Sequence, residues 1–155
     1  MKVQKKINIQ NKKARFEYEI LDKYTAGIQL TGTEIKSIRE SKARITESFC
    51  EFNDRGELFI VNMYIEEYTF GHHFNHKTTS ERRLLLNKRE LRSLKKDVEA
   101  KGNTIVPIRL FLNEKGWAKL EIALAKGKKT HDKRESLKDR DNKRDLARIK
   151  KTFNV

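Results

Sequence analysis

The strongest constraint on the fold is one segment in which two apolar-alternating runs flank a short polar turn. The runs are residues 104–112 and 117–125, and the turn between them is Asn113-Glu-Lys-Gly116. Successive side chains of a strand point to opposite faces. Lys119 and Glu121 therefore point away from the face shared by Ala118, Leu120, Ile122 and Leu124. The pattern predicts a long β-hairpin with one buried face.

Further alternating runs predict more strands. Residues 16–21 alternate apolar and polar, and residues 27–31 continue in the same period. Residues 49–52 and 58–61 flank a turn at residues 53–56, which predicts a second hairpin. Pro107 cannot donate a ladder hydrogen bond, so its strand is expected at an edge or a bulge.

Two helices are predicted between the strands. Thr33 is expected to cap a short helix over residues 34–39 that ends near Ser41. Asn87 is expected to cap a longer helix from Lys88 to about residue 101, closed by Gly102. Residues 68–80 have no clear period and are interpreted as a long loop.

These elements favour a mainly β fold with flanking helices. We expect a small closed antiparallel β-barrel of OB-like topology. Composition divides the chain into a basic, mobile N-terminal arm over residues 1–13, a central part with nearly all of the bulky apolar residues, and a basic C-terminal zone. We expect the barrel to span residues 14–130 and a basic, flexible tail to span residues 131–155.

The charge of the chain indicates an anionic partner. There are 36 Lys+Arg against 22 Asp+Glu, a net charge of +14. Nucleic acid is the commonest partner of such a surface, because each neutralised phosphate releases counterions. An anionic membrane is the competing partner and would need an apolar face beside the basic one. The longest apolar runs, residues 84–86 and 122–125, are far too short to span a bilayer. We therefore expect a cytoplasmic protein with no membrane partner.

The last thirty residues carry half of the net charge. Their apolar stripe is thin and consists of Leu146, Ile149 and Phe153. Such a segment cannot bury enough surface to hold itself on the body of the protein. We expect it to be disordered when free and to become a helix in an anionic groove.

Catalytic patterns are absent from the sequence. It contains no nucleophile elbow, Walker loop, dinucleotide fingerprint or zinc-protease motif, so we expect no enzyme and no cofactor. The single cysteine, Cys50, excludes an intrachain disulfide and is interpreted as a small strand residue. His72, His73 and His76 lie close together, but no carboxylate or cysteine joins them. They are expected to lie near RNA phosphates or solvent, with no bound metal.

Leu84-Leu85-Leu86 precedes the second predicted helix. Three consecutive leucines in an extended segment cannot all point inward, so one should be exposed. An exposed leucine beside Asn87 and several arginines and lysines suits packing on an unstacked base or sugar.

Several motifs in order resemble the SsrA-binding protein family. The matching stretches are Asn11-Lys-Lys-Ala-Arg-Phe-Glu-Tyr-Glu-Ile20, Ala26-Gly27, Gly32-Thr-Glu-Ile-Lys-Ser37, Lys42-Ala43, Phe74-Asn-His76, Arg83-Leu-Leu-Leu-Asn-Lys-Arg-Glu90 and Ala125-Lys-Gly-Lys-Lys-Thr-His-Asp-Lys-Arg134. The resemblance covers roughly residues 8–150. It implies a protein that binds the tRNA-like domain of transfer-messenger RNA (tmRNA) and delivers it to stalled ribosomes for trans-translation. It also implies a tail that occupies the decoding centre and the empty mRNA channel of the small subunit, in place of codon–anticodon pairing.

The resemblance assigns site residues by position. Leu85, Asn87 and Lys119 match family positions implicated in binding the tRNA-like domain, and we expect further RNA contacts from Lys126, Lys128 and Lys129. On the ribosome, the implied residues are His131, Asp132, Lys133, Arg134 and Ile149. Thr25 stands where the family typically has Glu at an RNA-contacting position. Its hydroxyl can still hydrogen-bond to RNA but carries no charge.

The resemblance also implies a monomer whose partners are tmRNA and the ribosome. Three other functions are also compatible with the sequence. They are a generic OB-type binder of single strands, a metal-dependent nuclease, and a ribosomal protein.

Overall fold

A computed structural model describes residues 6–100 and 102–127, and these form a mainly β fold with a few helices. The elements in chain order are β1 (Asn8–Gln10), α1 (Lys12–Glu17), β2 (Tyr18–Ile28), α2 (Gly32–Arg39), β3 (Ala43–Arg44), β4 (Phe49–Phe52), β5 (Leu58–Val61), β6 (Tyr64–Ile65), the 3-10 helix η1 (His72–Phe74), β7 (Arg82–Leu85), α3 (Lys88–Val98), β8 (Asn103–Leu112) and β9 (Ala118–Gly127).

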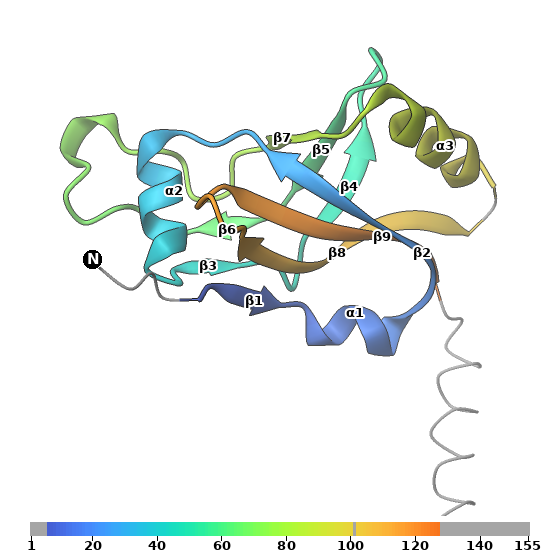
Figure 1. Cartoon of the computed structure of the whole chain (residues 1–155), viewed down its shortest axis with the longest axis horizontal. Coiled ribbons are helices and arrows are strands. Elements are labelled where there is room, and N and C mark those ends of the chain that lie inside the picture. The colour runs from blue at the N-terminus through green and yellow to red at the C-terminus, as the bar shows by residue number, and fades with distance from the viewer. Residues whose placement is uncertain (1–5, 101, 128–155) are drawn as a thin grey trace, which may run out of the picture.

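Seven strands pair in the order β1-β8-β4-β5-β7-β2-β9, and β8 also pairs with β9 (Figure 1). The pairings thus run from β8 through β4, β5, β7, β2 and β9 back to β8. β9 pairs with one edge of β8 along its whole length. β1 and β4 pair with opposite ends of the other edge of β8. The strands β3 and β6 form a separate two-stranded sheet. Every one of these pairings is antiparallel.

Both predicted hairpins are confirmed, and their turns are built alike. In the β4–β5 turn the side-chain oxygen of Asn53 accepts the backbone N–H groups of Arg55 and Glu57. Asn113 does the same for Lys115 and Trp117 between β8 and β9. Each turn ends at a glycine with positive φ, Gly56 and Gly116, because that conformation strains any side chain. The predicted irregularity at Pro107 is also confirmed, since the β8–β9 register shifts between Pro107 and Arg109.

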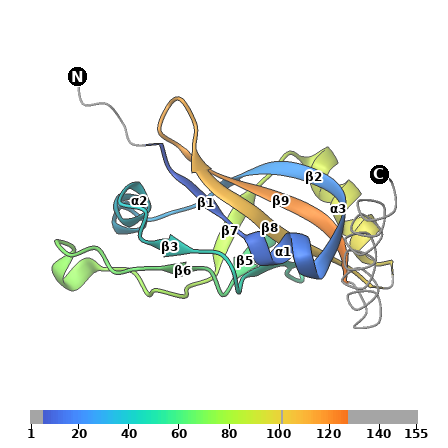
Figure 2. The ribbon, with the colours of Figure 1, turned by 90° about the horizontal axis from the view of Figure 1, so that it is seen from below.

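The core lies inside the ring of paired strands. Leu58, Ile60, Leu84, Leu110 and Ile122 are among its fully or almost fully buried members. A second, smaller cluster lies on the outer side of β8 and β9, where Ala14 of α1 packs with Val106, Ile108, Ala123 and Ala125. Figure 2 shows α1 against these strands, with α2 and α3 at opposite ends of the sheet.

The N-terminal segment departs from the prediction of a mobile arm. Residues 8–10 form β1 on the edge of β8, and Ile7 is buried in the core. The side chain of Asn11 caps α1 through the N–H of Ala14 and donates to the Pro107 carbonyl. Because of this cap, residues 16 and 17 are helical, and the prediction of a strand from residue 16 is wrong; β2 begins at Tyr18.

The two longer helices begin with capping boxes. In α2 the cap is Thr31, not the predicted Thr33: the Thr31 hydroxyl accepts the N–H of Glu34, whose carboxylate accepts the N–H of Thr31. In α3 the predicted cap Asn87 is confirmed, with Glu90 as its reciprocal partner. The helix α3 ends at Val98, and Gly102 follows with a φ of +85°.

Within the described residues, no helix is both long enough and apolar enough to cross a membrane. The predicted tail, residues 131–155, lies outside them.

Candidate RNA interface

Three of the strands bring two of the predicted RNA-binding residues, Leu85 and Lys119, into one row. Gly27 in β2 pairs with Leu85 of β7 on one side and with Lys119 of β9 on the other. A Cβ atom on Gly27 would lie 3.3 Å from the Cβ of Leu85. Glycine therefore lets β7 and β2 approach closely and leaves an open site between the leucine and the lysine.

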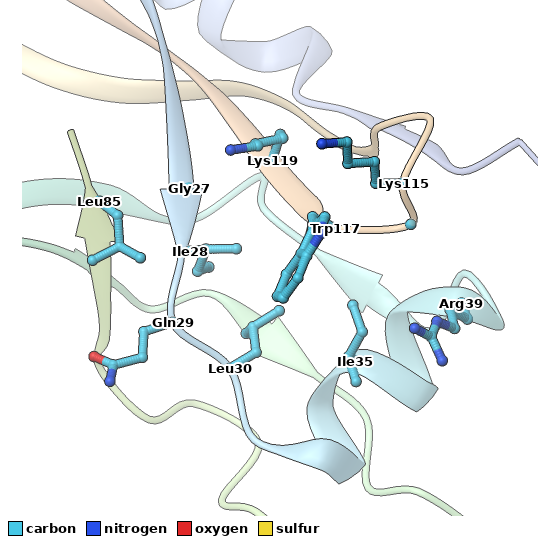
Figure 3. A pocket seen from close by; sticks show the side chains of 12 residues that line it. Gly27, Ile28, Gln29, Leu30, Ile35, Arg39, Leu85, Lys115, Trp117 and Lys119 are labelled. Carbon is cyan, nitrogen blue, oxygen red and sulfur yellow. The ribbon is translucent and has the colours of Figure 1, made fainter. Parts of the chain in front are cut away.

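This row borders a groove of about 530 Å³ (Figure 3). Its floor is apolar, with Ile28 buried and Leu30 and Ile35 half-buried. The indole of Trp117, 68% exposed, points toward Leu30 across the groove. Three cationic side chains complete the lining, namely Arg39, Lys115 and Lys119, and no lining residue in the described part of the chain is acidic. A groove with an apolar floor, an exposed aromatic ring and a basic rim suits a nucleotide.

The expectation of one exposed leucine is confirmed. Leu84 is buried in the core, Leu86 is half-buried and Leu85 is 50% exposed. The reason is the strand periodicity of β7, which points Arg82 and Leu84 inward and Arg83 and Leu85 outward.

Asn87 is exposed, and its side chain caps α3. Its oxygen accepts the N–H of Glu90 at 2.8 Å, and a carboxylate oxygen of Glu90 accepts the N–H of Asn87 at 3.2 Å. The cap uses the side-chain oxygen and leaves the amide nitrogen as the donor that can face a ligand.

Thr25 is exposed on β2, two residues before Gly27, and pairs with Glu121 of β9. The Glu121 carboxylate lies 2.8 Å from Nε of Arg109 and 3.8 Å from Nζ of Lys23. The Arg109 guanidinium in turn lies over the ring of Phe111, 4.3 Å from its centre. A carboxylate is thus present beside Thr25, but it belongs to the neighbouring strand and is already paired.

Lys126 is exposed near the end of β9, far along the strand from Lys119, and pairs across the sheet with Glu19 and Asn103. The other predicted site residues lie outside the described residues: Lys128, Lys129, His131, Asp132, Lys133, Arg134 and Ile149.

The predicted role of the histidine cluster is wrong for His76. Its ring is buried, with Nδ1 2.9 Å from the Thr33 hydroxyl and Nε2 3.0 Å from the carbonyl of Ile65. Because a carbonyl can only accept, Nε2 carries a proton, and in the neutral ring Nδ1 then accepts from Thr33. Residues 6–100 and 102–127 contain no group of three His, Cys, Asp or Glu residues placed to hold a metal ion.

The interpretation of Cys50 as a small strand residue is confirmed, and its side chain is buried. It lies in β4, and burial raises the pKa of its thiol well above the usual range. A thiol held protonated in this way is a poor nucleophile.

Sequence patterns did not identify several residues of the groove, among them Gly27, Arg39, Lys115 and Trp117. For Trp117 a signal was available. It precedes the inward-facing Ala118, so the alternation that points Lys119 outward predicts an outward tryptophan beside it. Arg39 and Lys115 carry no such signal, because only the tertiary fold brings α2 to the tip of the β8–β9 hairpin.

Fold and groove together define a β-sheet protein with a surface suited to RNA. The model of the SmpB protein family matches residues 8–152, and the chain belongs to this family. It is 70% identical to an SsrA-binding protein of Flavobacterium psychrophilum over 149 residues, 96% of this chain and 99% of the relative. An SsrA-binding protein of Bacteroides thetaiotaomicron is 56% identical over 146 residues, covering 94% and 97% of the two chains.

A solved structure described as "tmRNA-SmpB: a journey to the center of the bacterial ribosome" contains a similar chain. The two are 46% identical with a TM-score of 0.69, covering 84% of this chain and 94% of that one.

Proposed function

We propose that this protein binds tmRNA at the groove and delivers it to stalled ribosomes for trans-translation. Family membership supports this, as do relatives that are SsrA-binding proteins and a similar chain in a structure of tmRNA and SmpB on the ribosome. The observation that carries the proposal is the groove with an apolar floor and a basic rim, which is bordered by the Leu85–Gly27–Lys119 row and by the exposed Trp117.

The groove can hold RNA by two kinds of contact. The exposed faces of Leu85 and Trp117 take an unstacked base or a sugar, since every base has an apolar π-face. Lys119, Lys115 and Arg39 neutralise phosphates, which supplies affinity without sequence selectivity.

Residues outside the groove extend this contact. The Asn87 amide nitrogen and the Thr25 hydroxyl donate to RNA oxygens. Lys126, Lys128 and Lys129 carry the basic surface along β9 and beyond it.

The proposed division of labour follows the predicted parts of the chain. Residues 14–130 hold the RNA, with residues 1–13 as a basic N-terminal segment. Residues 131–155 act on the ribosome, where they become helical in the decoding centre and mRNA channel. His131, Asp132, Lys133 and Arg134 act at the decoding centre, and Ile149 belongs to the same tail that acts on the ribosome. The high positive charge of this segment suits a groove lined by ribosomal RNA.

We also propose that the ring of strands is a closed barrel of OB-like topology. The return of the pairings to β8 supports it. The protein acts in the cytoplasm, as a monomer, and contributes shape and charge while the ribosome performs the chemistry. EDTA-sensitive cleavage of tmRNA by the purified protein would contradict the assignment as a non-enzyme.

The first experiment measures tmRNA binding as a function of salt. The wild type should bind in the nanomolar range, and the affinity should fall steeply as salt rises. Lys119→Gln should weaken binding and reduce the slope of log K against log [salt] by about 0.7–0.9, the value for one phosphate contact. Leu85→Ala should weaken binding with little change in the slope. Equal affinity for an unrelated RNA of similar size would contradict the proposal.

The second experiment separates body from tail. Deleting residues 131–155 should leave tmRNA binding largely intact and abolish peptide tagging on stalled ribosomes. Tagging by the shortened protein would show that the tail role is wrong. Sequencing the RNA that co-purifies with the full chain identifies the partner directly.

A further inference from the structure

The segment between β6 and β7 exposes two phenylalanines that the groove does not use. Phe70 is 69% exposed and Phe74, in η1, is 91% exposed. In Figures 1 and 2 this segment, drawn in green, extends beyond α2 at one end of the molecule. We call residues 68–75 the aromatic loop.

The aromatic loop is held in a defined shape by the side chain of Asn75. Its oxygen accepts the N–H of Tyr68 at 3.0 Å, and its amide nitrogen donates to the Tyr68 carbonyl at 2.7 Å. These two hydrogen bonds link the two ends of the loop, residues 68 and 75. Gly71 is required for this closure, because a Cβ atom there would lie 2.6 Å from Nδ2 of Asn75.

Both ends of the loop are fixed to the body. His76 is buried between the Thr33 hydroxyl of α2 and the Ile65 carbonyl of β6. At the other end, Nζ of Lys36 in α2 lies 5.4 Å from the centre of the Tyr68 ring, and Phe70 packs edge-on against the same ring. Phe74 is therefore held out in water by an anchored loop.

The charge around the aromatic loop differs between its two sides. Residues 68–80 contain no Asp or Glu. Glu66 and Glu67 are exposed and line one side of the loop, in a pocket with Tyr68, Thr69 and Asn75, whereas the side toward α2 is basic. Lys36 and Lys77 are exposed cations beside it. The helix α2 joins the loop to the groove, since Thr33 and Lys36 face the loop while Ile35 and Arg39 line the groove.

We propose that the aromatic loop is a second RNA-contacting element, in which Phe74 stacks on an unpaired RNA base and Phe70 borders the stacked base. Aromatic rings stack on bases with little regard to sequence. A ring presented on a closed, anchored loop loses less conformational freedom on binding than one on a free segment. The inference rests on the proposed RNA-binding function and extends it to a surface separate from the groove.

An apolar pocket of a protein partner would also cover an exposed phenylalanine. The two partners differ in what they require of the side chain. Stacking requires an aromatic ring, whereas an apolar pocket accepts leucine at a similar volume. Substitutions at residue 74 therefore separate the two.

The test titrates Phe74→Ala, Phe74→Leu and Phe74→Trp against purified tmRNA and, in parallel, against stalled ribosomes supplied with tmRNA. Phe74→Ala and Phe74→Leu should both bind roughly five- to a hundredfold more weakly, the range expected for loss of one base stack. Phe74→Trp should bind at least as well as the wild type. In a Trp117→Phe background its fluorescence should be quenched on binding. Phe16→Ala, which removes an exposed phenylalanine from α1, is the matched control and should bind normally.

The two titrations show which RNA contains the base that stacks on Phe74. Weaker binding to free tmRNA assigns the base to tmRNA, and weaker binding on ribosomes alone assigns it to ribosomal RNA. If Phe74→Leu binds as the wild type does while Phe74→Ala is weak, the loop docks on protein and stacking is wrong. If all variants match a wild type that binds tmRNA, the loop proposal falls and the proposed function stands. If the wild type binds neither target, both fall.

Discussion

The groove and the aromatic loop present aromatic and basic groups by different physical means. At the groove, hydrogen-bonded strands position the side chains, and the Leu85–Gly27–Lys119 row follows from the register of β7, β2 and β9. At the aromatic loop, two side-chain hydrogen bonds of Asn75 and the small size of Gly71 position the exposed rings. A substitution in the groove should change chemistry without moving the backbone, while a substitution in the loop should change its shape.

Both regions are joined to β7, so the largest expected effect comes from that strand. Arg82 is buried, pairs with the buried Glu34 carboxylate, and donates to the carbonyls of Met63, Lys77 and Thr78. Arg82→Met leaves Glu34 as an unpaired buried charge and should lower the free energy of unfolding by about 3–5 kcal/mol. Urea denaturation measures the loss.

The neighbouring Arg83 is the matched control. It pairs with Glu57 at 3.0 Å on the surface, where its side chain is 45% exposed. Arg83→Met should change the free energy of unfolding by less than about 1 kcal/mol. Equal losses for the two variants would show that the buried pair contributes no more to stability than the surface pair.

Substitutions at two glycines test the claim that Gly71 is required for the Asn75 side chain to close the aromatic loop. Gly71→Ala places a methyl group on the Asn75 side chain and should cost about 1–3 kcal/mol. Gly32→Ala, in the first turn of α2 with no atom within 4 Å of the new Cβ, should add about 0.4–1 kcal/mol. The measurement is thermal unfolding, and a stabilising Gly71→Ala would contradict the proposed closure.

Two substitutions at Asn87 separate its role as the cap of α3 from its proposed contact with RNA. Asn87→Ala loses the cap of α3 and should cost roughly 1 kcal/mol of stability along with RNA affinity. Asn87→Ser keeps a capping oxygen but loses the amide nitrogen, so stability should be largely retained while affinity falls. Urea denaturation and tmRNA titration are compared for the two variants. Normal RNA affinity for Asn87→Ser would mean that Asn87 acts only as a cap.

The smallest effect is expected at Thr25. Thr25→Glu places a second carboxylate opposite Glu121 on the adjacent strand. Directly opposed like charges should cost about 0.2–1 kcal/mol, and salt should reduce the loss. Urea denaturation at low and high salt measures it. A loss that does not respond to salt would indicate a cause other than repulsion.

Much of the sheet could be predicted because its determinants are local. Alternation and Asn-x-x-Gly turns predict both hairpins, and Asn87 predicts the start of α3. The predicted start of β2 was wrong. Alternation of apolar and polar residues extends back to Phe16, but the Asn11 side chain caps a helix that includes Phe16, and alternation carries no information about that cap. The short strands β3 and β6 were missed because two residues are too few to show a period.

The site was predictable where strand periodicity applies and unpredictable where tertiary structure assembles it. The exposed Leu85 and the outward Lys119 follow from alternation. Arg39 reaches the groove only through the placement of α2, and His76 is buried only because Thr33 and Ile65 meet its ring.

The pairing of β1 with β8 has a consequence for the synthesis of this protein. Asn8 pairs with Phe111, and Gly27 with Lys119, so the first strands find their neighbours only near the end of the described chain. Contacts between distant positions slow folding, because the loop between them must close first. The nascent chain therefore emerges with its early strands unpaired. A product cut short before β8 and β9 cannot complete the ring and exposes strand edges that favour aggregation.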